Sequence, residues 1–174
     1  MSKKMELKFS AATGELSGYA STFGGEPDSY GDVIAPGAFA ASIKAHKAAG
    51  TMPLMLWGHD ASKVPIGVWN EIREDATGLY VAGRLNLEIA AAREVHSSLI
   101  AAKGGSLSIG FRTPPGGRVP LGKGVYSLKA IDLFEVSIVN MPANRRARIT
   151  NVKSSNNSLA DKIDRAITHI RNMK

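Results

Sequence analysis

Cysteine is absent from the 174 residues of this chain. Disulfides, thiolate metal sites and cysteine nucleophiles are therefore excluded. No apolar run approaches the roughly 18 residues that a membrane-spanning helix needs. The first residues, MSKKMELKF, are charged and lack the apolar core of a signal peptide. We therefore expect no membrane association and no export by the usual signal.

Aromatic residues are also scarce, at 6% of the chain, and they are scattered. This argues against a stacking platform for single-stranded nucleic acid. The net charge is +7, but residues 145–174 hold eight Lys and Arg against two Asp and Glu. The remainder is nearly neutral, which favours a basic tail on a neutral domain over a nucleic-acid-binding fold. The sequence has no paired-histidine spacing, P-loop or GxGxxG fingerprint, so we expect no metal and no cofactor.

Short alternating segments separated by turn residues dominate the sequence. They predict strands or short apolar runs at 5–9, 15–23, 52–57, 64–71, 78–85, 106–113, 125–130 and 131–139. Helical spacing predicts helices at 38–49 and 87–102, while 114–120 is expected to be a loop and Pro142 to end the last strand. This pattern predicts a mainly β (α+β) fold, a closed or curled antiparallel β-barrel with surrounding helices.

The chain divides by composition into three parts. Residues 1–150 form the predicted β-barrel domain, and the polar stretch 151–157 is a predicted linker. Residues 158–174 are predicted to form a basic amphipathic helix, since apolar residues recur there at helical spacing. That apolar face consists of Leu159, Ile163, Ala166, Ile167 and Ile170.

The stretch GGSLSIGF, residues 104–111, has small residues where a strand usually has larger ones. Ser108 can be interpreted as a small residue at a close approach of two layers, or as a nucleophile that needs a neighbouring base. Its glycines would leave room for a substrate carbonyl, and backbone N–H groups around Ile109 and Gly110 could hold an oxyanion. Ser106 faces the same side of the strand and is an alternative nucleophile.

His59 differs from the other three histidines because it directly follows an apolar run, MPLMLWG, whereas the others fall on predicted helices. Its side chain could simply be satisfied in a turn by Asp60. It could also act as the general base for a serine nucleophile.

Glu135 lies in the otherwise apolar stretch FEVSIV, and a buried carboxylate needs a partner. One hypothesis is a salt bridge to Arg112 or Arg84. The other is a carboxylate that orients His59 in a Ser-His-acid triad, for which Asp132 and Asp60 are the alternative acids.

Taken together and in their order along the chain, several segments resemble the HK97-type prohead (capsid maturation) serine proteases of tailed phages. This family is related to the herpesvirus assemblins. Each segment by itself resembles the family only weakly, but the order and spacing of the segments together are specific to it. The segments are GYASTF, DSYGDVIAPGAFAASI, PLMLWGHD, PIGVWNEIREDATGLYVAGRL, GGSLSIGF and LFEVSIVNMPANRRARI.

The resemblance implies an assemblin-like closed barrel and a Ser/His catalytic pair, carried by His59 of WGHD and Ser108 of SIGF. Herpesvirus enzymes use a second histidine as the third member. Here Glu135 stands in that region of the chain. The resemblance also suggests that a basic loop at Arg145 and Arg146 helps form the oxyanion site, although a solvated basic stretch is an equal interpretation.

The implied function is a serine endopeptidase of capsid maturation that acts inside the procapsid in the host cytoplasm. Its implied partners are the major capsid protein and scaffold segments as substrates, and it would cut itself as well. We also expect a homo-oligomer, such as a dimer, and no specific nucleic acid. The main alternative is an inactive scaffold or assembly protein with a relict protease fold; a nucleic-acid-binding barrel and a small-substrate esterase are weaker ones.

Overall fold

The computed structural model describes residues 13–153. Within them the chain forms ten strands and two helices. In chain order these are β1 (Glu15–Thr22), β2 (Asp32–Ile34), α1 (Ala40–Ala49), β3 (Leu54–Trp57), β4 (Gly67–Glu74), β5 (Gly78–Leu85), α2 (Ala90–Ala101), β6 (Gly105–Arg112), β7 (Arg118–Gly122), β8 (Val125–Leu128), β9 (Asp132–Val139) and β10 (Arg148–Val152). The predicted strand at 5–9 and helix at 158–174 lie outside the described residues, as does most of the predicted linker.

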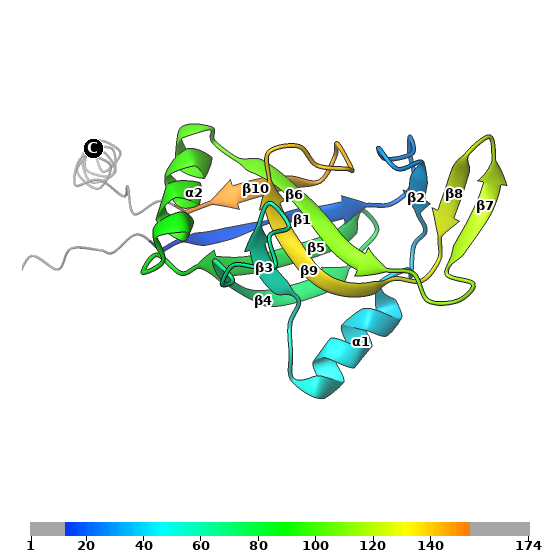
Figure 1. The fold of residues 1–174 in the computed structure, drawn as a ribbon, viewed down its shortest axis with the longest axis horizontal. Coiled ribbons are helices and arrows are strands. Elements are labelled where there is room, and N and C mark those ends of the chain that lie inside the picture. The colour runs from blue at the N-terminus through cyan, green and yellow to red at the C-terminus, as the bar shows by residue number, and fades with distance from the viewer. Residues whose placement is uncertain (1–12, 154–174) are drawn as a thin grey trace, which may run out of the picture.

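Seven strands close into a barrel in the order β1-β10-β6-β9-β3-β4-β5, and pairing of β5 with β1 completes it (Figure 1). This confirms the predicted mainly β fold. One pair departs from the antiparallel expectation, because β3 runs parallel to β9. These two strands are far apart in sequence, so their relative direction cannot be inferred from local hairpins.

Three strands differ from the prediction. β7 lies within the predicted loop at 114–120, and together with β8 and the short β2 it forms a separate three-stranded sheet. β8 was expected to close the main sheet, but it pairs with β2 and β7 instead. Both β7 and β8 are largely exposed or half-buried, so they lack the apolar alternation that marks a core strand.

The chain also re-enters the barrel after Pro142, where the sequence predicted no further strand. β10 pairs with β1 over four residues and with β6 only at Arg148 and Ile149. It runs to Val152, two residues beyond the predicted domain boundary at 150. Only one side chain of this strand, RITNV, is buried, so its sequence lacks the apolar alternation that predicts a strand.

Apolar side chains from alternate positions of the strands fill the barrel. Met55, Leu107, Val136 and Ile138 are almost completely buried in this core. Burial of such side chains contributes roughly 1.5–3 kcal/mol each. The Trp69 indole N–H donates a 3.2 Å hydrogen bond to the Val136 carbonyl, which satisfies the polar atom that the ring brings inside. Because successive strand residues point to opposite faces, the residues between these core positions lie on the outer face of the barrel.

The two helices lie at different places around the barrel (Figure 1). α1 contacts β4 and β9, and α2 contacts β5. α1 ends at Gly50, whose φ of 64° is the left-handed conformation that favours glycine, as the sequence predicts. Of the helices within residues 13–153, neither is long and apolar enough to cross a membrane.

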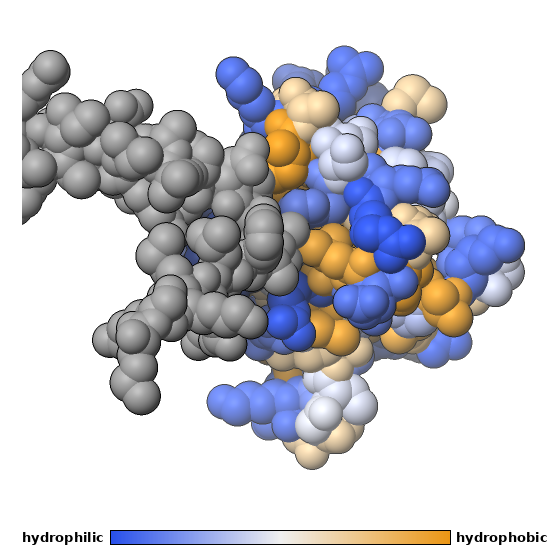
Figure 2. Space-filling view, turned by 90° about the vertical axis from the view of Figure 1, so that its left-hand side faces the viewer, coloured by the Kyte–Doolittle hydropathy of each residue, from blue (hydrophilic) through white to orange (hydrophobic). Residues whose placement is uncertain are grey.

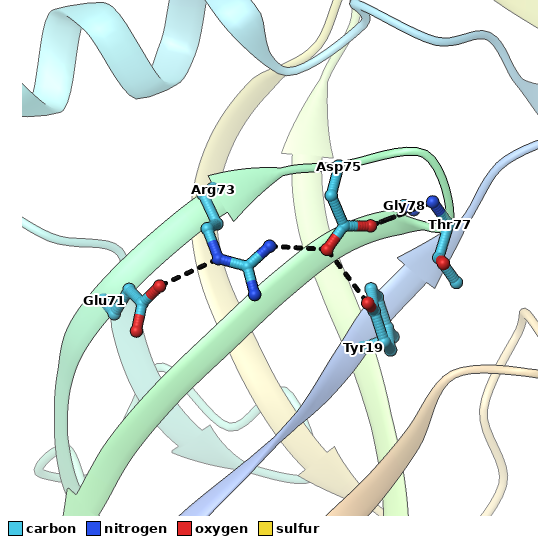
Figure 3. Close-up of polar contacts among 6 residues, drawn as sticks. All are labelled: Tyr19, Glu71, Arg73, Asp75, Thr77 and Gly78. Atoms are coloured by element: carbon cyan, nitrogen blue, oxygen red, sulfur yellow. Dashed lines mark hydrogen bonds and ion pairs between the residues drawn. The ribbon is translucent and has the colours of Figure 1, made fainter.

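A polar network braces the hairpin between β4 and β5 (Figure 3). Asp75 accepts hydrogen bonds from the Thr77 N–H at 2.9 Å, the Tyr19 hydroxyl at 2.9 Å and Arg73 at 2.5 Å. Arg73 also donates to Glu71 at 2.9 Å. The backbone hydrogen bond from Thr77, followed by the bonds from Arg73 and Tyr19, lowers the pKa of Asp75 from its ordinary 3.8 to about 2.

Charged and polar residues cover much of the face shown in Figure 2, with apolar residues gathered in a patch between them. Two exposed apolar residues, Leu54 and Val68, occupy paired positions on β3 and β4. The outer surface therefore offers both charged and apolar groups to solvent. The expected homo-oligomer stays a prediction.

Candidate active site

Three segments far apart in the sequence bring the predicted residues together. Ser108 lies in the middle of β6, Glu135 lies on β9, and His59 follows the end of β3. These three strands are consecutive neighbours in the barrel. In the β6–β9 register, Ser108 is opposite Ser137 and Gly110 is opposite Glu135. The barrel therefore places the serine, the carboxylate and the histidine in one region.

This region lies on the outer face of the barrel, yet its polar side chains are buried. Leu107 and Val136 point into the core, so their neighbours Ser108 and Glu135 point outward. Ser108 is only 7% exposed and Glu135 only 8%, while Ser137 is completely buried. Polar groups shielded from water in this way need hydrogen-bond partners. Glu135 and Ser137 have such partners in each other and in His59.

His59 sits in a sharp turn directly after β3. Its φ of 63° is uncommon for a residue other than glycine. The turn is held by hydrogen bonds from the Gly58 N–H to the Ile138 carbonyl at 2.9 Å and from the His59 N–H to the Ser137 hydroxyl at 3.2 Å. This local strain is maintained by β9, the same strand that carries Glu135.

Glu135 joins His59 and Ser137 in a short chain of hydrogen bonds. His59 Nδ1 lies 2.5 Å from Glu135 Oε1, and the Ser137 hydroxyl donates to Glu135 Oε2 at 2.6 Å. An ionised carboxylate can only accept, so Nδ1 carries the proton in the neutral ring. Nε2 is then left as the basic nitrogen. The His59 side chain is 42% exposed, against 11% for Glu135, so the ring extends from a buried anchor toward solvent.

Glycine at position 110 has a direct steric cause. A Cβ atom built there would lie 2.1 Å from Glu135 Oε1. The sequence suggested that the glycines leave room for a substrate carbonyl, but Gly110 leaves room for the Glu135 carboxylate. At the other end of the stretch, a Cβ on Gly105 would lie 2.3 Å from a methyl group of Leu99 in α2. The glycines around Ser108 thus accommodate neighbours on both sides.

The alternative acids for the triad have other contacts. Asp60 accepts hydrogen bonds from both the hydroxyl and the N–H of Ser62, and these bonds lower the pKa of Asp60. Asp132 is exposed and pairs in register with Arg112. The Arg112 guanidinium lies over the Phe134 ring at 4.7 Å, so it is not the partner of Glu135. Glu135 is the acid that contacts His59.

Ser106, the alternative nucleophile, has a structural partner. Its hydroxyl accepts a 2.7 Å hydrogen bond from Arg148 on β10. Ser106 does not line the pocket that contains His59 and Ser108. The two serines face the same side of β6, but the barrel gives them different surroundings.

His59 and Ser108 line one pocket of about 380 Å³. Among the described side chains no direct hydrogen bond joins them, and catalytic hydrogen bonds often become short only when substrate is bound. A larger pocket of about 550 Å³ near Thr13 and Arg84 contains neither residue. The smaller pocket thus combines a serine with a histidine.

The loop after β9 forms part of the pocket wall through Ala143 and Asn144. The Asn144 side chain donates to the Thr22 carbonyl and hydroxyl, and Arg146 donates to the carbonyls of Phe23 and Gly24. Arg146 thereby attaches this loop to the end of β1, although both Arg145 and Arg146 are exposed. A role for this basic pair at an oxyanion stays a prediction.

Sequence reasoning missed Ser137, which contacts both His59 and Glu135. A signal for it existed, because Ser137 lies two residues after Glu135 in an apolar strand and so shares its face. Sequence reasoning also missed the contributions of Asp28 and Asn144 to the pocket, since these come from loops. Within residues 13–153, no three His, Asp or Glu side chains gather as metal ligands would.

Two known proteins are similar to this chain. The prohead protease of Enterobacteria phage HK97 is 33% identical over 155 residues, which cover 86% of this chain and 65% of the relative. The chain thus spans slightly less than two thirds of that relative's length. Among solved structures, a KSHV protease in complex with a hexapeptide phosphonate inhibitor has a TM-score of 0.49 and 13% identity, covering 78% of this chain and 63% of the other.

A family model describing the caudovirus prohead serine proteases matches residues 3–162. This span includes every strand of the barrel and all three predicted site residues. The chain therefore belongs to the caudovirus prohead serine protease family.

Proposed function

We propose that this chain is a serine endopeptidase of capsid maturation, with Ser108 as nucleophile, His59 as general base and Glu135 as the acid that orients it. The main supporting observation is the 2.5 Å contact between His59 and Glu135 at a pocket that Ser108 also lines. Membership in the prohead serine protease family supports the reaction class.

The proposed chemistry has two halves. As Ser108 Oγ attacks the scissile carbonyl carbon, His59 Nε2 takes the Ser108 proton, and Glu135 stabilises the resulting imidazolium. His59 then gives this proton to the leaving amine as the C–N bond breaks, which leaves Ser108 acylated. A water molecule attacks the acyl group with His59 again as base, and Ser108 leaves with the proton.

The free edge of β6 supports an extended polypeptide as substrate. Leu107 N–H donates to the Ala147 carbonyl, so the backbone polar groups of Leu107 face β10. Those of Ile109 face the same side, but β10 pairs with β6 only at Ser106 and Gly105. A peptide could add to the edge at Ile109 as another strand and present its carbonyl beside Ser108.

We further propose that the substrates are scaffold segments and the N-terminal segment of the major capsid protein, cut inside the procapsid. The chain's own residues after β10 are another proposed substrate. The relation to the HK97 prohead protease supports these assignments.

Co-expression with the major capsid protein of the same phage tests the proposal. The wild-type chain should shorten the capsid protein, and Ser108→Ala should leave it whole, as read by intact mass. Ser106→Ala is the matched control because it removes the same hydroxyl two residues away on the same face, and it should retain cleavage. If all three chains leave the capsid protein whole, the inactive assembly protein becomes the better hypothesis. If only Ser106→Ala is inactive, the nucleophile has been assigned wrongly.

A further inference from the structure

The pocket beside Ser108 is lined by both apolar and polar residues, and its lining contains a single carboxylate. Its apolar lining comes from the end of β1, from β2, from β6 and from the loop after β9. These side chains are Ala20, Ile34, Ile109, Phe111 and Ala143. Asp28 is the one acidic residue of the lining. A volume of about 380 Å³ accommodates a long side chain.

Asp28 is held in place through one of its two carboxylate oxygens. Oδ1 accepts hydrogen bonds from the N–H groups of Tyr30 at 2.9 Å and Asp32 at 3.0 Å. Among residues 13–153, Oδ2 has no hydrogen bond, and no lysine or arginine forms an ion pair with Asp28. The carboxylate is therefore oriented by its loop and retains an unused acceptor.

The loop that carries Asp28 is fixed from two directions. Arg118 Nε on β7 donates a 2.9 Å hydrogen bond to Asp32 Oδ1, and a second guanidinium nitrogen forms an ion pair with the same oxygen at 2.9 Å. The Ser29 N–H donates to the Ala143 carbonyl at 3.2 Å, which ties the loop to another residue of the pocket lining. The small β2-β8-β7 sheet thus supports one wall of this pocket.

A buried hydroxyl lies in the same lining as Asp28. Ser21 is only 1% exposed, and its hydroxyl has no hydrogen-bond partner among the described residues. Buried hydroxyls without partners are rare in folded proteins and call for an explanation. A ligand that donates hydrogen bonds inside the pocket would provide one.

We propose that this pocket binds a lysine or arginine side chain of the polypeptide substrate, at a residue adjacent to the scissile bond. The aliphatic stem packs against the apolar walls, and the cationic end pairs with Asp28 Oδ2. An acidic side chain would be repelled by Asp28, and an aliphatic one would leave the carboxylate unpaired. This inference rests on the proposed peptidase function, since Ser108 defines where the bond is cut.

Cleavage of a complex peptide library tests this specificity. The library is a bacterial lysate digested by a glutamate-specific protease, and the sites cut by the full-length chain are identified by mass spectrometry. Lysine and arginine should be enriched at one of the two positions flanking the cut. Asp28→Asn keeps the oxygen that caps Tyr30 and Asp32 while removing the charge. It should reduce this preference about ten-fold.

Glu26→Gln is the matched control, because it removes an equal charge from the same exposed loop at a residue outside the pocket. It should keep the wild-type preference. Ser21→Ala should weaken the preference by a smaller factor. Ser108-dependent cutting without a basic preference, or a preference unchanged in Asp28→Asn, would overturn the inference and leave the peptidase function intact. Absence of any Ser108-dependent cutting would instead overturn the peptidase function and the inference with it.

Discussion

Two carboxylates in different parts of the barrel both take part in hydrogen bonds but have different partners and surroundings. Asp75 contacts backbone N–H groups, a tyrosine hydroxyl and an arginine (Figure 3). Glu135 contacts a serine hydroxyl and a histidine ring. The Asp75 network braces a hairpin at the surface, whereas Glu135 is buried beside a pocket that contains a serine.

The two networks differ in whether the partner of the carboxylate can accept and release a proton. Arginine stays protonated at every ordinary pH and has no acceptor, so the Asp75 network only stabilises structure. Histidine bonded through Nδ1 keeps a basic Nε2, which can take and return a proton. Under the proposed function, Glu135 can therefore contribute to chemistry because its partner His59 keeps a free basic nitrogen at a pocket, whereas the partner of Asp75 does not.

Glu135→Gln should have the largest effect in this comparison. Glutamine preserves the shape but favours the wrong histidine tautomer, so kcat should fall about 10⁴-fold, as is typical for the acid of such a triad. The measurement is the rate of capsid-protein cleavage, with circular dichroism to check folding. Retention of wild-type activity in a folded variant would show that Glu135 is only a structural partner of His59.

Gly110→Ala should have the next largest effect. The added methyl group would overlap Glu135 Oε1 and must displace the carboxylate from His59. A displacement of about 1 Å can reduce a rate about 100-fold. Steady-state cleavage should therefore show this loss, together with a lower melting temperature. Gly116→Ala, at a turn glycine with no neighbour near the added Cβ but with a φ of 75°, provides a control that affects stability alone.

Ser137→Ala should have a smaller effect on the same site. It removes one hydrogen bond to Glu135 and the acceptor for the His59 N–H, but leaves the His59–Glu135 contact itself. Loss of one bond to a charged group should lower kcat about 10-fold. Because the proposed role of Ser137 is to position His59 and Glu135 and not to touch substrate, KM should stay unchanged. A rise in KM with unchanged kcat would contradict this role.

Asp75→Asn should leave cleavage activity unchanged and lower the melting temperature at neutral pH. The pKa of Asp75 is lower in the folded state than its ordinary 3.8, so its contribution to stability is fully present above about pH 4 and is lost as the pH falls toward about 2. Thermal melts of both chains at pH 7, 4 and 2 should show a difference that shrinks with acidification. A difference independent of pH would mean that the Asp75 charge does not stabilise the hairpin.

Much of the fold was predictable where one face of an element is buried. Strand β5 was predicted with its observed bounds, because Leu79, Val81 and Leu85 alternate with more exposed residues. The end of α1 was predicted from Gly50. The sequence analysis missed β7 and β10 because most of their side chains are exposed or half-buried, so no alternating apolar pattern marks them as strands. Strands distant in sequence also contribute to their pairing.

The candidate site could be nominated from sequence only as a set of residue types with alternatives. His59, Ser108 and Glu135 stood out because polar residues interrupted apolar strands or followed them. The choice between Glu135, Asp132 and Asp60 needed the β3–β9 pairing, which brings the turn after Trp57 beside Glu135. Ser106 and Ser108 are equivalent by strand parity, and their surroundings differ only in the folded barrel, where Ser106 binds Arg148 and Ser108 lines the pocket with His59.

The sequence by itself determined the class of fold, the lack of thiol chemistry, the strand that carries Ser108 and the short list of groups able to act with it. The lack of thiol chemistry follows from the composition of the chain. The fold class, the strand and the candidate groups follow from patterns that extend over only a few residues. The tertiary structure alone decided which acid contacts the histidine, why position 110 is glycine, and that Asp28 and Ser21 share the pocket of Ser108. Those contacts join segments up to about 90 residues apart, and closure of the barrel through strand pairing is what brings them within hydrogen-bonding distance or into one pocket.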